Sequence, residues 1–68
     1  MIRDFQFENS SMLSSCSYND ETYELSVIFV GGKEYTYIDV DKGVYNSLIN
    51  TPSPGRYFNS IKNDLVQK

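Results

Sequence analysis

Two tyrosines separated by one residue, Tyr35 and Tyr37, are the side chains of this 68-residue chain best suited to bind a planar ligand. In a β-strand, residues two apart lie on the same side of the sheet, so both rings would form one aromatic surface. The bases of single-stranded nucleic acid stack on such surfaces. The pair therefore indicates a nucleotide or RNA contact if it faces away from the core, and ordinary packing if it faces inward.

A second candidate site lies in residues 53–59, SPGRYFN. Serine followed by proline is typical of a helix start, where unpaired N–H groups and a partial positive charge attract anions. Gly55 would allow a phosphate or carboxylate to approach the backbone, and Arg56 would add charge. The structural alternative is that Ser53 caps the helix and Gly55 lets the turn pack on the sheet. The residues expected to contact RNA, a nucleotide or a partner are Tyr35, Tyr37, Ser53, Gly55, Arg56, Tyr57, Asn59 and Lys62.

The residues needed for catalysis or metal binding are scarce. The chain has no histidine and one cysteine, Cys16, so a zinc cluster and an intrachain disulfide are both excluded. No serine stands beside a base, and so short a chain can hardly enclose a large pocket. We therefore expect no enzyme activity, no metal and no cofactor.

The charge of the chain is unevenly distributed. The net charge is −3, but residues 1–41 hold eight acids and two bases, whereas residues 42–68 hold one acid and four bases. Nonspecific binding of nucleic acid depends on neutralising phosphates, so the negative net charge argues against strong nonspecific binding. An anionic partner would instead contact the C-terminal third, although small domains also acquire such imbalance by chance.

The composition also bears on location and source. The chain has no apolar run of the kind found in signal peptides or membrane spans, so no membrane association is expected. The unpaired cysteine favours the cytoplasm, which would be the host cytoplasm for a phage protein. Six tyrosines, six asparagines and nine serines against two arginines suggest a low-GC bacterial or phage source.

The alternation of apolar residues changes to helical spacing at Val40. This order predicts a single α+β domain, a three-stranded antiparallel meander followed by two short helices (β-β-β-α-α). In the first strand Met12 is placed on the same side as Cys16, with Leu13 opposite. Residues 1–9 are expected to form a loose N-terminal extension and residues 10–65 the core. The expected strands span 12–18, 23–30 and 33–38, and the expected helices span 40–50 and 54–65.

The loop at Gly31-Gly32 decides which way the tyrosines face. If these two glycines alone form the turn, Tyr35 lies opposite Ile28 and both tyrosines point away from the Leu25 face. A three-residue loop that includes Lys33 shifts the pairing by one residue and brings both tyrosines onto the Leu25 face. The sequence leaves both registers open.

Several short motifs occur along the chain in a defined order. They are Ser10-Ser11 with Leu13, Cys16 and Tyr18; Leu25, Val27 and Phe29 before Gly32; Tyr35, Tyr37 and Val40; and Leu48, Ser53, Gly55 and residues 57–62. In this order the chain resembles the KTSC domain, a module named for its occurrence at the C-terminus of some lysyl-tRNA synthetases. The resemblance covers Ser10 to about Leu65. The chain departs from the family pattern at Ser17, Asn19, Asp41 and Thr51.

The resemblance implies a small domain that also occurs as a stand-alone bacterial or phage protein. It implies no established catalytic activity, and RNA binding is suggested by the fusion to a tRNA-charging enzyme. Two functions therefore stand side by side. One is a non-catalytic module that binds RNA or a nucleotide. The other is a protein-interaction module, such as a small phage factor acting on a host protein or defence system, as a monomer or a homodimer.

Overall fold

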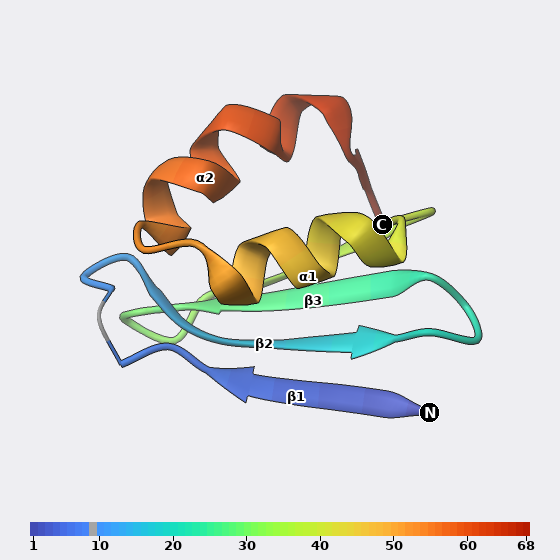
Figure 1. Cartoon of the computed structure of the whole chain (residues 1–68), viewed down its shortest axis with the longest axis horizontal. Coiled ribbons are helices and arrows are strands. Elements are labelled where there is room, and N and C mark those ends of the chain that lie inside the picture. The colour runs from blue at the N-terminus through green and yellow to red at the C-terminus, as the bar shows by residue number, and fades with distance from the viewer. Residues whose placement is uncertain (9) are drawn as a thin grey trace.

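The computed structural model describes residues 1–8 and 10–68, and within them an antiparallel sheet carries two helices on one face (Figure 1). The strands follow one another across the sheet in chain order. None of the described helices has the length and apolar character needed to span a membrane. The elements are β1 (Ile2–Gln6), β2 (Leu13–Asn19), β3 (Glu24–Phe29), β4 (Glu34–Ile38), α1 (Lys42–Asn50), α2 (Pro54–Ile61), the 3₁₀ turn η1 (Lys62–Asp64) and β5 (Val66–Gln67).

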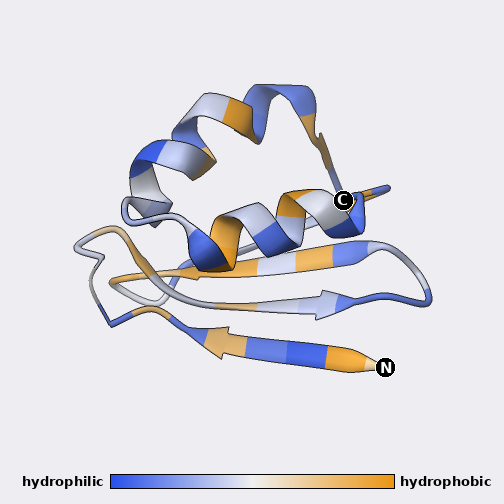
Figure 2. Cartoon of the chain, viewed as in Figure 1, coloured by the Kyte–Doolittle hydropathy of each residue, from blue (hydrophilic) through white to orange (hydrophobic). Residues whose placement is uncertain are grey.

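The predicted α+β class is confirmed, but the sheet has five strands where the sequence predicted three. Residues 2–6 are no loose arm, because β1 pairs antiparallel with β2 and sets Phe5 opposite Cys16. Asn9, at the end of the expected extension, lies outside the described residues. Figure 2 shows why β1 is inconspicuous in the sequence: two hydrophilic residues, Arg3 and Asp4, separate its hydrophobic ones. At the other edge, β5 pairs with β4 through only Val66 and Gln67.

A bulge in β2 changes which side chains enter the core. The pairing with β3 shifts between Leu13 and Ser15, so one residue of β2 has no partner there. Leu13 and Cys16, three residues apart, are consequently both buried together with Tyr18. The expectation that Leu13 lies opposite Cys16 is therefore wrong, because the bulge restores Leu13 to the inner face.

The first helix begins later than the sequence predicts, at Lys42 instead of Val40. Val40 is fully buried in the connection before the helix. Its N–H donates to the carbonyl oxygen of Tyr23 at 2.8 Å, and its own carbonyl accepts from the hydroxyl of Tyr18 at 2.6 Å. Both polar groups of this residue are thereby used to fix the crossover from β4 to α1 against the corner between β2 and β3.

The second helix begins as predicted, with Ser53 at the N-cap and Pro54 as its first residue. The Ser53 side chain makes no capping hydrogen bond. The helix ends at Ile61, and the predicted continuation to Leu65 is replaced by η1 and an extended residue. Phe58 is the fully buried residue of α2 that joins the core between helices and sheet.

Candidate ligand-binding groove

The β3–β4 hairpin places both tyrosines on the Leu25 face of the sheet. Tyr37 pairs with Leu25, and Tyr35 pairs with Val27. The hairpin loop has three residues, because the N–H of Phe29 donates to the carbonyl oxygen of Lys33 at 2.7 Å. The loop therefore consists of Val30, Gly31 and Gly32, whereas the predicted three-residue loop consisted of the two glycines and Lys33. Neither predicted register is therefore present, but the observed one puts the tyrosines on the same face as the three-residue alternative did.

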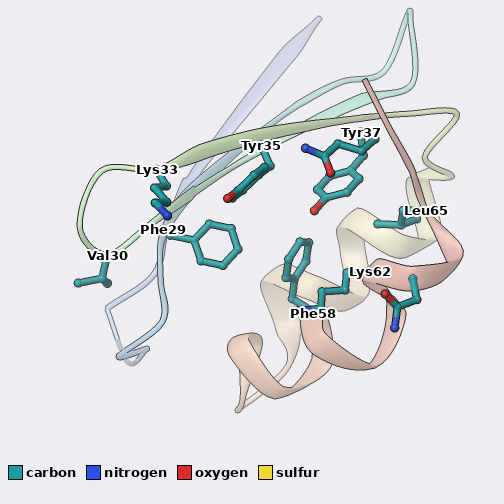
Figure 3. A pocket seen from close by; sticks show the side chains of 10 residues that line it. Phe29, Val30, Lys33, Tyr35, Tyr37, Phe58, Lys62 and Leu65 are labelled. Carbon is teal, nitrogen blue, oxygen red and sulfur yellow. The ribbon is translucent and has the colours of Figure 1, made fainter.

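The inward tyrosines are not completely enclosed. A groove of about 650 Å³ runs between the hairpin and the segment formed by α2 and η1. Figure 3 shows the side chains of Phe29, Tyr35 and Tyr37 reaching from the hairpin toward Phe58 of α2. The residues lining the groove are Phe29, Val30, Lys33, Tyr35, Tyr37, Phe58, Lys62, Asn63, Leu65 and Gln67.

Four aromatic rings fix the inner wall of this groove. Phe29 makes edge-to-face contacts with Tyr35 and Phe58 at centroid distances of 5.5 and 5.7 Å, and Tyr37 meets Phe58 at 5.6 Å. Such contacts stabilise the pairs beyond the burial of their surface. Phe58 is fully buried, whereas Phe29 and Tyr35 are half-buried. The wall is thus held in place by packing and keeps accessible aromatic surface at its rim.

The hydroxyl of Tyr37 is directed into the groove (Figure 3). Only 6% of Tyr37 is exposed, and its hydroxyl has no hydrogen-bond partner among the described residues. No fully buried side-chain oxygen or nitrogen among the described residues lacks a partner, so this hydroxyl must retain access to the groove. Burial, and then the neighbouring Tyr35, raise the pKa of Tyr37. The group therefore stays neutral and can both donate and accept a hydrogen bond.

Two lysines give the groove its charge. Lys33 and Lys62 line it, and neither forms an ion pair within the described part of the chain. Its lining contains no aspartate or glutamate. A groove with two ammonium groups and no carboxylate is a local positive region in a chain whose net charge is −3. Such a region favours an anionic ligand.

The start of α2 forms a different surface. A shallow depression of about 430 Å³ brings Ser53, Gly55, Arg56 and Asn59 together with residues 10–12. The space in front of Gly55 is occupied by Met12, since a β-carbon at residue 55 would stand 3.0 Å from the β-carbon of Met12. Asn59 also donates to the Met12 sulfur at 3.6 Å. Packing against Met12 thus accounts for Gly55.

The predicted contact residues are divided between these two places. Tyr35, Tyr37 and Lys62 line the groove, whereas Ser53, Gly55, Arg56 and Asn59 line the depression at the start of α2. Tyr57 lines neither and packs half-buried against the core. The groove residues that the sequence did not single out as contacts are Phe29, Val30, Lys33, Phe58, Asn63, Leu65 and Gln67.

Comparison with known proteins places this arrangement in a family. Residues 9–64 match the family model of the KTSC domain. The chain belongs to the KTSC domain family. The KTSC match spans β2 to η1, so β1 and the Gln67 wall of the groove lie beyond it.

One solved structure shows the same fold over the whole chain. It is the crystal structure of a KTSC domain protein from Yersinia pestis, with a TM-score of 0.89. The two sequences are 22% identical, and the similarity covers 100% of this chain and 96% of the other. A search of the curated proteins gave no match.

Proposed function

We propose that this KTSC domain is a non-catalytic, cytoplasmic binding module whose groove takes a nucleotide or a short single-stranded RNA. The observation that carries the proposal is the combination of aromatic walls with Lys33 and Lys62 and without any lining carboxylate. A base offers a planar face to aromatic side chains, and its phosphate offers a negative charge to lysines.

A base would not stack on an open aromatic surface in this groove. The half-buried rings of Phe29 and Tyr35 present their accessible parts at the rim, so a base would enter the groove beside them. Two lysines give about two phosphate contacts, and each contributes about −0.7 to the slope of log K against log salt for a single strand. The dependence of affinity on salt should therefore be shallow. Binding without catalysis agrees with the absence of any histidine from the sequence.

The test is fluorescence anisotropy with a labelled single-stranded pentaribonucleotide at low salt. We expect Lys33→Glu and Lys62→Glu each to weaken binding by about tenfold, because each replaces an attraction to phosphate with repulsion. Lys42→Glu is the matched control: Lys42 is an exposed α1 lysine outside the groove and without an ion pair among the described residues. No binding by the unmodified protein, or an equal loss with Lys42→Glu, would contradict the proposal.

Arg56→Ala examines the start of α2 separately. This arginine is exposed and lines the depression next to Met12, away from the lining of the groove. If its loss weakens binding as much as the groove variants do, the ligand extends over the depression as well. If binding is unchanged, the ligand is confined to the groove.

A protein partner is the second candidate. It is favoured by β1, which forms an edge of the sheet and exposes 62% of Ile2. An outer strand edge presents backbone groups that can pair with another strand, including β1 of a second copy. Light scattering of the purified protein measures this directly: a dimer that Asp4→Pro converts to monomer would support pairing through β1. A monomer at all concentrations would contradict the homodimer.

A further inference from the structure

Tyr37 and Gln67 are direct neighbours across β4 and β5, and both line the groove. Side chains directly opposite one another in an antiparallel pair lie on the same face, with β-carbons about 5 Å apart. Tyr37 as a residue is only 6% exposed, and its hydroxyl, directed into the groove, keeps access to it and has no partner among the described residues. The Gln67 side chain likewise forms no hydrogen bond within the described part of the chain. The two residues thus provide an unused set of polar groups in one corner of an aromatic groove.

These groups are suited to the edge of a base more than to a phosphate. Both are neutral, whereas the cationic groups of the groove are Lys33 and Lys62. A glutamine amide presents one donor and one acceptor side by side, the pattern that pairs with N6 and N7 of adenine. The hydroxyl of Tyr37, the residue paired with Gln67, adds a group that can donate or accept. Guanine offers two acceptors at the corresponding edge, which suits arginine or lysine better.

We infer that the groove is selective for its base, with Tyr37 and Gln67 reading the edge of an adenine whose ring packs against the aromatic wall. This inference rests on the proposed nucleotide function and adds the base to it. A purine also gives the larger ring for packing on Phe29 and Tyr35. A ligand that leaves the Tyr37 hydroxyl unpaired is disfavoured, because a buried polar group without a partner is destabilising.

The experiment is isothermal titration with AMP, GMP, CMP and UMP, and with ribose 5-phosphate as a probe without a base. We expect AMP to bind about tenfold more tightly than the other nucleotides. Tyr37→Phe keeps the ring and removes only the hydroxyl, and Gln67→Met keeps the length and removes the amide. Each should reduce the affinity for AMP to nearly that for the other bases and leave ribose 5-phosphate unaffected.

Two controls separate the possible failures. Gln6→Met removes a glutamine from the opposite edge strand, outside the groove, and should leave the preference for AMP intact. Thermal unfolding of both groove variants verifies that the hairpin is preserved. Equal affinities for the four nucleotides, or a preference that survives both substitutions, would overturn the base selectivity while leaving the nucleotide function standing. Absence of binding by every probe would overturn the proposed function and the selectivity together.

Discussion

The side chain of Met12 lies directly against the backbone of Gly55. A β-carbon on residue 55 would stand 3.0 Å from the Met12 β-carbon and 3.2 Å from its sulfur. Met12 is also held in place, because its N–H donates to Ser10 Oγ at 3.1 Å and its carbonyl accepts from Val30 N–H at 2.9 Å. Packing, and not an unusual torsion angle, therefore restricts residue 55 to glycine.

Gly55→Ala should destabilise the domain by about 1 kcal/mol. Overpacking costs about 1–3 kcal/mol, and alanine recovers up to about 1 kcal/mol over glycine within a helix. Gly43→Ala is the matched control, since Gly43 is the second residue of α1 as Gly55 is of α2, and its nearest neighbour would be Asp41 Oδ2 at 3.6 Å. That control should gain about 0.5–1 kcal/mol. Urea unfolding measures the free energy of unfolding of both variants. Equal values for Gly55→Ala and Gly43→Ala would show that the contact with Met12 contributes nothing.

Tyr18→Phe should lower the free energy of unfolding by about 1–2 kcal/mol. It removes the 2.6 Å hydrogen bond to the carbonyl of fully buried Val40 and leaves that oxygen without this donor. Tyr45 provides a comparison, because its ring stacks on that of Tyr18 at 5.0 Å and its hydroxyl has no partner among the described residues. Tyr45→Phe should change stability by less than about 0.5 kcal/mol. A loss of the same size in both variants would show that the hydrogen bond to Val40 makes no specific contribution.

Asp39 has a left-handed backbone with a φ of 55°. This conformation is unfavourable for most residues, tolerated by asparagine and glycine, and worst for β-branched side chains. Asp39→Asn should therefore preserve or slightly raise stability, and Asp39→Val should lower it by about 1–2 kcal/mol. Asp41→Val is the comparison at an extended residue with a φ of −66°, where the loss should be clearly smaller. Thermal unfolding that ranks Asp39→Val as the more stable of the two valine variants would contradict this account.

The thiol of Cys16 should be chemically inert in the folded protein. Burial, and then the charge of Asp4, raise the pKa of Cys16 from 9.0 to about 12. The thiolate fraction at pH 8 is then about a thousandfold smaller than in the unfolded chain. Reaction with a chromogenic disulfide reagent should accordingly be slow in buffer and rapid in urea. Rapid reaction in buffer would show that Cys16 opens to solvent without global unfolding.

The same raised pKa predicts a pH dependence of stability. The unfolded chain loses the Cys16 proton near pH 9.0 and the folded chain near pH 12, so the contribution of Cys16 to stability is constant below pH 9 and falls as the pH rises to 12. The raised pKa values of Tyr18, Tyr37 and Tyr45 act in the same direction above pH 10. Cys16→Ala should therefore flatten the decline that begins at pH 9 but not abolish it. An unaltered profile would exclude Cys16 as a cause.

Local sequence patterns were sufficient for the central elements of the fold. Period-two alternation identified β2 to β4, and the Ser53-Pro54 pair identified the start of α2. The edge strands could not be found in this way, because β5 has two residues and β1 depends on pairing with β2. The bulge before Ser15 could not be found from alternation either. One unpaired residue in a strand moves the side chains that precede it to the opposite face of the sheet.

The groove was harder to predict than the strands. The orientation of Tyr35 and Tyr37 depends on whether the hairpin loop holds two residues or three, and two glycines permit either. The remaining walls come from α2, η1 and β5, segments that only tertiary packing brings beside the hairpin. Lys62 was identified through its charge, whereas Gln67 carries no sequence signal that separates it from an ordinary surface residue.

The order of the strands across the sheet has a consequence for how the chain folds. Because β1 to β4 pair only with their neighbours in sequence, these strands can assemble through short loop closures, which are fast. The pairing of β5 with β4 closes a much longer loop that contains both helices. We therefore expect β5 to dock late, so that a pulse-labelling experiment would find the amide of Lys68, which donates to the carbonyl oxygen of Thr36 at 2.8 Å, protected after those of β2 and β3. The ability to bind a ligand would then arise in the last step of folding, when Gln67 reaches Tyr37.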